Sequence, residues 1–75
     1  MKRAFITGIT GFAAMHLTEY LIGKGCEISG IFFPADSSQN FVNRFPHVKI
    51  HFCDLLEQSK LQQILLEFRP EVIFH

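Results

Sequence analysis

The chain has 75 residues, enough for one domain at most, and a domain of this size buries only about 60% of the surface that its unfolded chain exposes. Hydrophobic residues make up 48% of the sequence, which excludes a largely disordered chain. Seven basic and seven acidic residues cancel without forming a basic cluster, which argues against a nucleic-acid partner. No apolar run approaches a membrane span and no signal-peptide pattern is present, so we expect a cytoplasmic protein without a membrane partner.

The first predicted strand, Met1 to Thr7, runs directly into a glycine turn with the spacing Gly8-x-x-Gly11-x-x-Ala14. Gly8 allows a backbone conformation that a side chain would oppose, Gly11 leaves no Cβ between the backbone and a pyrophosphate, and Ala14 lets a helix pack closely on the strand. The helix that follows would direct its first N–H groups at the phosphates. The pattern predicts a dinucleotide-binding turn, with a plain tight turn as the alternative. A P-loop is excluded because no Gly-Lys-Ser/Thr follows Gly11.

A helix is predicted from about Phe12 to Lys24, because apolar residues recur there at helical spacing and glycines bracket its end. The apolar positions are Ala13, Ala14, Leu17, Tyr20 and Leu21. The positions expected to face solvent are His16, Thr18, Glu19 and Lys24. This division predicts which face of the helix packs on a sheet.

A second strand, Glu27 to Phe33, has the nearly continuous apolar run of a strand buried on both faces. NAD-binding folds place an acidic residue near the end of this strand for the ribose hydroxyls, whereas NADP-binding folds often place an arginine nearby. Here the strand ends Phe32-Phe33-Pro34-Ala35, so neither residue is present. Asp36, Ser37 and Ser38 follow, and they fit either a contact with the ribose or its 2′-phosphate or an ordinary turn.

Between residues 34 and 47, Phe41, Val42 and Phe45 suggest one short helix packed against the sheet. Val48 to Phe52 alternates apolar with polar residues, which is typical of a strand with one solvated face. We therefore expect this third strand to be the outermost one.

Cys53-Asp54-Leu55 follows the third strand, at the edge of a parallel sheet where ligands bind. Asp54 could accept a hydrogen bond from an adenine amino group. It could equally cap a helix, because Asp54 and Glu57 have capping-box spacing, while Ser59 offers a rival helix start. The spacing alone does not decide between adenine contact and capping.

The last predicted elements are a helix and a short strand, Val72 to Phe74. The helix has an apolar stripe and ends at Arg69-Pro70, because a residue before proline is disfavoured in a helix. Its stripe consists of Leu61, Ile64, Leu65 and Phe68. Right-handed crossovers then give an α/β fold: the N-terminal half of a doubly wound parallel (Rossmann) sheet, incomplete, with strand order 3-2-1-4. We expect residues 1–75 to be the N-terminal part of a dinucleotide-binding domain in a longer polypeptide, because an apolar edge strand would otherwise be exposed.

Cys26 and Cys53 do not form a disulfide framework and are expected to be free thiols beside strands. The four histidines are scattered without metal-ligand spacing, so we assign them no metal.

Several of these motifs together resemble the extended short-chain dehydrogenase/reductase family of nucleotide-sugar epimerases and dehydratases. The similarity covers nearly the whole chain and is carried by Thr7–Phe12 with Ala14 and Leu17, Lys24-Gly25, Cys53-Asp54-Leu55 and Arg69–His75. Lys2–Gly11, and Gly30-Ile31 followed by a serine pair, are most similar to the GDP-mannose 4,6-dehydratases and related 4-keto-reductases.

The resemblance implies NAD or NADP as cofactor, with Asp54 and Leu55 holding the adenine. The residues implied on the pyrophosphate and nicotinamide side are Gly8, Thr10, Gly11, Phe12 and Ala13. Ala14 stands where the family usually has glycine, which the fingerprint tolerates. The family usually has Asp or Arg near Phe32 or Phe33, and its absence leaves the choice of cofactor open.

The implied activity is oxidation of a hexose C4 hydroxyl by hydride transfer, with a Tyr-x-x-x-Lys pair supplying the base, in a homo-oligomer that takes a nucleotide-sugar substrate. Tyr20 and Lys24 match that pattern, but a rise of about 1.5 Å per residue puts them more than about 10 Å from the glycine turn. No catalytic base is therefore assigned. The expected function is the NAD(P)-binding portion of a nucleotide-sugar dehydratase or epimerase. The alternatives are a non-catalytic dinucleotide-binding sensor of the same fold, or a small interaction module that associates through its open edge.

Overall fold

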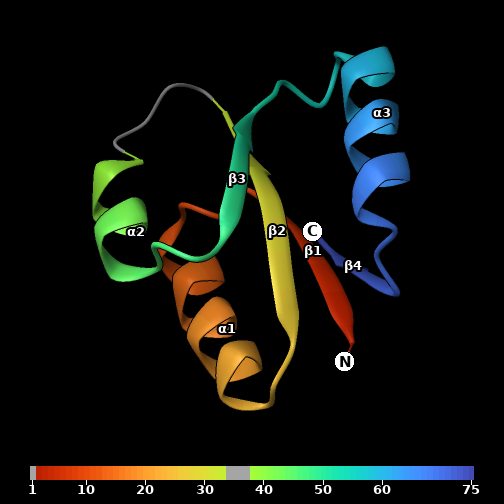
Figure 1. Ribbon diagram of the computed structural model, residues 1–75. Helices are drawn as coiled ribbons and strands as arrows, with labels where there is room; N and C mark the ends of the chain where they lie inside the picture. Colours follow the sequence, from red (N-terminus) through yellow and green to blue (C-terminus); the bar gives the residue numbers. More distant parts are fainter. Residues whose placement is uncertain (1, 34–37) are drawn as a thin grey trace.

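A computed structural model of the chain describes residues 2–33 and 38–75. Four strands form one parallel sheet in the order β3-β2-β1-β4, as predicted (Figure 1). The strands are β1 (Arg3–Thr7), β2 (Glu27–Phe32), β3 (Lys49–Phe52) and β4 (Val72–Phe74). The helices that connect them are α1 (Phe12–Gly23), α2 (Gln39–Arg44) and α3 (Gln58–Phe68). The α/β class and the doubly wound topology are thereby confirmed.

All four strands end at the same edge of the sheet. Thr7 of β1 pairs with Ile31 of β2, and Phe32 at the end of β2 pairs with Phe52 at the end of β3. β3 lies outermost, as its alternating sequence predicted. The turns that follow β1, β2 and β3 therefore meet at one edge, where parallel sheets bind their ligands.

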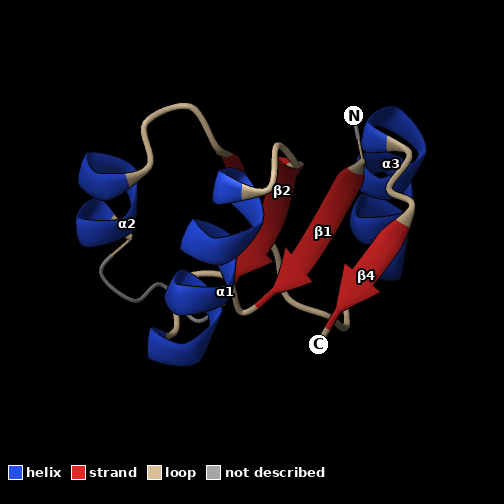
Figure 2. Cartoon of the chain, turned by 90° about the horizontal axis from the view of Figure 1, so that it is seen from below, coloured by secondary structure: helices blue, strands red, loops and turns tan. Residues whose placement is uncertain are grey.

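The helices cover both faces of the sheet (Figure 2), and two apolar clusters lie beneath them. Ala4 and Ile6 of β1 belong to the cluster under α1 and α2, whereas Phe5 between them belongs to the cluster under α3. This division follows from the alternation of side chains along a strand. A strand buried on both faces gives the glycine turn at its end a rigid base.

The buried stripe of α1 differs from the prediction at three positions. Thr18 is fully buried, although it was expected to face solvent, and Ala13 and Tyr20 are exposed, although they were expected to face the sheet. The Thr18 hydroxyl donates to the carbonyl of Ala14 at 2.8 Å, which satisfies its polar group inside the core. The stripe thus runs through Ala14, Leu17, Thr18 and Leu21, at the spacing i, i+3, i+4, i+7.

The other two helices confirm most of their predicted packing. Phe41 and Phe45 of the short helix region are buried, while Val42 is half exposed. The predicted stripe of α3 packs on the sheet as expected. α3 ends at Phe68, and Arg69 before the proline adopts a left-handed conformation with φ of 56°.

Candidate functional site

The glycine turn between β1 and α1 has the geometry that its sequence predicted. Gly8 has a φ of +62°, a region that L side chains rarely adopt. The N–H of Gly11 donates to the carbonyl of Gly8 at 3.0 Å, and a Cβ on Gly11 would lie only 3.3 Å from that oxygen. The turn thus favours glycine at position 8 through its backbone conformation and at position 11 through a close backbone approach.

Ile9 and Gly30 hold this turn against the sheet. The N–H of Ile9 donates to the carbonyl of Ile31 at 3.0 Å, and the Ile9 side chain is fully buried. A Cβ on Gly30 would lie 2.4 Å from the carbonyl oxygen of Ile6 and 2.7 Å from Cδ1 of Ile9. Gly30 therefore allows the turn to pack against the sheet, and the sequence prediction missed this role. The available signal was a glycine in the interior of a strand, which often marks a close approach.

The N-terminus of α1 faces the crevice above the turn. Gly11 is its N-cap, in an extended conformation, and the first helical bond runs from the N–H of Met15 to the carbonyl of Gly11 at 2.9 Å. The N–H groups of Phe12, Ala13 and Ala14 consequently need acceptors from outside the helix. Together with the positive end of the helix dipole, they suit an anion such as a phosphate.

A cavity of about 410 Å³ lies between the start of α1 and the end of β4. We call it the turn-side cavity; its lining includes Thr7, Gly8, Gly11, Phe12, Ala13, Phe74 and His75. Four of the predicted contact residues are thereby brought together, while Thr10 does not line the cavity. Phe12 is 82% exposed, and its ring packs edge-on against the ring of His16, with the two centroids 4.6 Å apart.

Thr7 ties the turn-side cavity to the end of β4. Its hydroxyl lies 3.3 Å from the carbonyl of Phe74 and 3.2 Å from Nδ1 of His75. These residues are distant in the sequence, and only the pairing of β1 with β4 brings them together. The sequence prediction assigned none of Thr7, Phe74 and His75 to the site.

A second cavity, of about 250 Å³, lies between the ends of β2 and β3. We call it the base-side cavity; its lining consists of Thr7, Gly8, Ile31, Phe32, Phe33, Cys53, Asp54 and Leu55. Thr7 and Gly8 line both cavities, so the two meet at the glycine turn. Apart from Thr10, the predicted contact residues therefore line one crevice over the carboxyl edge of the sheet.

Asp54 combines a place in the base-side cavity with a local turn. One carboxylate oxygen, Oδ1, accepts from the N–H of Leu56 at 3.0 Å, and the Glu57 carboxylate accepts from the N–H of Asp54 at 3.0 Å. The Glu57 bond is one half of a capping box, whereas the Asp54 carboxylate bonds two residues on instead of three, and α3 begins only at Gln58. Neither Asp54 nor Ser59 caps the helix, so both predicted helix starts are wrong.

Cys53 forms part of the floor of the base-side cavity. Its N–H donates to the carbonyl of Phe32 at 3.1 Å, which joins the ends of β2 and β3. Burial, and then the nearby Glu57 carboxylate, raises the pKa of the Cys53 thiol above its usual value. Cys53 and the partly buried Cys26 are both free thiols, as predicted. With its raised pKa, the Cys53 thiol lines the cavity as a poor nucleophile.

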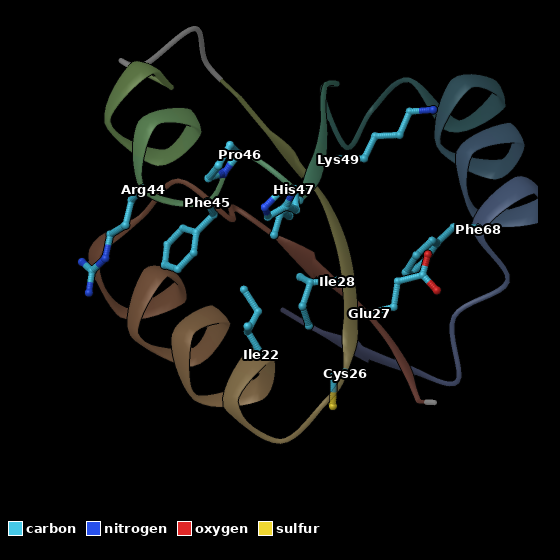
Figure 3. Close-up of a pocket in the computed structure, with 11 residues that line it drawn as sticks. Ile22, Cys26, Glu27, Ile28, Arg44, Phe45, Pro46, His47, Lys49 and Phe68 are labelled. Atoms are coloured by element: carbon cyan, nitrogen blue, oxygen red, sulfur yellow. The ribbon is translucent and has the colours of Figure 1, made fainter.

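Other candidate features lie away from the crevice. Tyr20 and Lys24 are near each other, with Nζ 5.5 Å from the ring centroid, at the far end of α1 from the turn. A cavity of about 420 Å³ opens at the opposite edge of the sheet, where Ile22, Ile28 and Phe45 converge (Figure 3). It contains none of the predicted site residues. Asp36 and Ser37 lie outside the described residues, and Ser38 precedes α2 and accepts its first helical bond.

Within residues 2–33 and 38–75, no group of three His, Cys, Asp or Glu side chains is placed to hold a metal ion. None of the helices in that part of the chain combines the length and apolar character needed to span a membrane.

The parallel sheet, the glycine turn opening a helix and the crevice beside it define half of a doubly wound dinucleotide-binding fold. The family model for GDP-mannose 4,6 dehydratase matches residues 5–75, nearly the whole chain. The chain belongs to this family of nucleotide-sugar dehydratases.

The individual relatives agree with this assignment. A GDP-mannose 4,6-dehydratase of Vibrio cholerae is 35% identical over 83 residues, which cover 99% of this chain and 22% of that protein. A CDP-glucose 4,6-dehydratase of Salmonella typhimurium is 31% identical, covering 99% of this chain and 21% of that protein. Among solved structures, the Bordetella bronchiseptica enzyme WbmH in complex with NAD+ has a TM-score of 0.82 and 25% identity, covering 100% of this chain and 25% of that one. The chain thus spans about a fifth to a quarter of the length of these three proteins.

Proposed function

We propose that the chain is the NAD(P)-binding portion of a nucleotide-sugar 4,6-dehydratase or epimerase that acts by transient hydride transfer at hexose C4. The observation that supports this most is the meeting of two cavities at Thr7 and Gly8, which gives one crevice with a phosphate-binding helix terminus in its middle. A dinucleotide has the matching layout, with a base and a nicotinamide on either side of a pyrophosphate. The nicotinamide would supply the hydride chemistry when bound.

The turn-side residues fit the pyrophosphate and the nicotinamide half. Gly8 and Gly11 leave the backbone bare, and the N–H groups at the start of α1 are available as donors. The residues proposed to contact this half are Gly8, Thr10, Gly11, Phe12 and Ala13. For Thr10, which lies beside the cavity rather than in its lining, the support is the family resemblance alone.

The base-side residues fit the adenine. Asp54 Oδ1 is engaged by the N–H of Leu56, which orients the carboxylate and leaves its other oxygen to accept from the adenine amino group. Leu55, which is half exposed, would contact the face of the base. The local turn and the adenine contact are thus compatible roles for Asp54.

The proposal is tested by titrating the purified protein calorimetrically with NAD and NADP. We expect micromolar or tighter dinucleotide binding. The Gly11→Val protein should lose dinucleotide binding, because its side chain enters the phosphate cradle. Gly23→Ala is the matched control, since a Cβ at Gly23 meets open space at the far end of α1. Absence of dinucleotide binding by the unsubstituted protein would reject the proposal.

A further inference from the structure

Two partly exposed phenylalanines stand at the end of the second and third strands. Phe33, directly after β2, is 48% exposed and lines the base-side cavity. Phe52, at the end of β3, is 42% exposed and does not line the cavity. The centroids of the two rings are 5.4 Å apart, and Phe52 also packs edge-on against Phe32 at 5.5 Å. The ring of Phe33 is therefore backed by an aromatic support and turned toward the cavity.

The exposure of these rings contrasts with the aromatic core. Phe5, Phe41 and Phe45 are buried, as expected for side chains whose apolar area is costly to leave in water. Phe52 is held by its register opposite Phe32, and its carbonyl accepts from the Lys60 ammonium. An exposed ring fixed at the mouth of a cavity is suited to bind a flat, apolar face.

We propose that Phe33 stacks on the adenine ring of the dinucleotide and that Phe52 is a positioning residue behind it. This inference rests on the proposed function and assigns a side chain to the base that neither the family pattern nor the comparisons supply. Phe33, Asp54 and Leu55 line the same cavity, so a base stacked on the ring can present its amino edge to the carboxylate. Phe33 occupies the place where related folds carry a charged residue for the ribose. At this position the chain would therefore contact the face of the adenine base, where related folds contact the ribose.

The test separates the two halves of the dinucleotide by using AMP and nicotinamide mononucleotide as probes, together with NAD and NADP. In Phe33→Ala, we expect affinity for AMP, NAD and NADP to fall at least about tenfold, because stacking on an aromatic side chain is lost. Affinity for nicotinamide mononucleotide should stay within about twofold. Phe33→Tyr should keep the affinity for AMP, whereas Phe33→Leu should lose it. Phe52→Ala should show a smaller loss, of roughly threefold, with the same selectivity for AMP.

Tyr20→Ala is the matched control, because Tyr20 is an exposed aromatic residue near the far end of α1 that lines neither cavity. It should leave AMP affinity unchanged. A second measurement does not depend on variants: ring stacking should shift the adenine H2 and H8 resonances upfield on binding to the unsubstituted protein, and Phe33→Leu should abolish the shift.

The outcomes distinguish this inference from the function on which it rests. If the unsubstituted protein binds neither NAD nor AMP, the proposed function fails, and this inference with it. If it binds both, but Phe33→Ala binds AMP equally well or loses AMP and nicotinamide mononucleotide alike, only the stacking role is overturned. Tight AMP binding without an upfield shift of the adenine protons would overturn it as well.

Discussion

The two cavities of the crevice are built by different means. The turn-side cavity contains the bare backbone of two glycines and the first N–H groups of α1, whereas the base-side cavity contains the side chains of Phe33, Asp54 and Leu55. Backbone geometry tolerates no substitution that adds a Cβ in the wrong place. The side chains that line a cavity can be replaced one at a time, and each replacement removes one contact. We therefore expect substitutions on the turn side to abolish binding and those on the base side to reduce and redirect it.

The largest effect should come from the glycine that supports the turn from the neighbouring strand. In Gly30→Val, the Cβ would meet the backbone oxygen of Ile6 at 2.4 Å, and backbone cannot move aside as a flexible side chain can. We expect a loss of roughly 3 kcal/mol or more in the free energy of unfolding, measured by urea denaturation. A stability close to that of the unsubstituted protein would show that the Ile9–Gly30 contact does not hold the turn.

The next effect separates the strain of a turn from its role in binding. Gly8 and Gly25 both have a positive φ, and a Cβ on either would meet no atom within 4 Å. Gly8→Ala and Gly25→Ala should therefore cost a similar amount of stability, about 1–2 kcal/mol each. Only Gly8→Ala should lower NAD affinity, by more than about tenfold, because Gly8 lines both cavities. Equal NAD affinity in the two variants, measured by calorimetry, would contradict a phosphate-binding role for the turn.

On the base side, Asp54→Asn should change which base is preferred. The amide oxygen can still accept from the N–H of Leu56, but the NH₂ group would then face the amino group of adenine, two donors opposed. We expect roughly tenfold weaker binding of AMP and a gain for inosine monophosphate, which presents an acceptor at that position. Glu57→Gln is the control, because Glu57 shares the turn but does not line the cavity. An unchanged ratio of the two affinities would place the base elsewhere.

The smallest effect concerns pH and a histidine of β3 that lies outside both cavities. Burial, and then the Lys49 charge, lowers the pKa of His51 below its ordinary 6.5, with Glu67 opposing and Lys60 assisting. His51 thus binds a proton more readily in the unfolded chain than in the folded one. The stability that comes from keeping His51 neutral is therefore present above pH 6.5 and is lost on acidification. His51→Gln should therefore show a smaller drop in melting temperature between pH 7.5 and about pH 5.5 than the unsubstituted protein. An identical drop would remove His51 as the cause.

The sequence predicted the parts of this fold that depend on local pattern. The glycine turn, the strand order and the outermost place of β3 follow from spacing, alternation and the handedness of crossovers, and the structure has all three. The start of α3 was mispredicted because Asp54 and Glu57 satisfy each other in a turn that does not continue into the helix. Local hydrogen bonds can complete a capping pattern without starting a helix there.

The missed residues depend on contacts between distant parts of the chain. The demand for glycine at position 30 arises from the backbone of Ile6 and the side chain of Ile9, and the place of Thr7 in the site arises from pairing with β4. Likewise, Thr18 is buried because packing fixed the rotation of α1, and its hydroxyl found a carbonyl within the helix. These requirements arise from contacts in the folded structure, so the periodicity of the sequence does not reveal them.

The outermost position of β3 bears on the order of events during ligand exchange. β1 has a strand on each side, whereas β3 pairs with β2 alone among the residues that the structure describes. Strands at the end of a sheet open with lower free energy, so amide hydrogens of β3 should exchange with solvent before those of β1. The walls of the crevice at the ends of β3 and β4, the two outer strands, are then expected to open before the glycine turn that follows β1. A bound dinucleotide would keep its phosphates anchored at that turn until the last step.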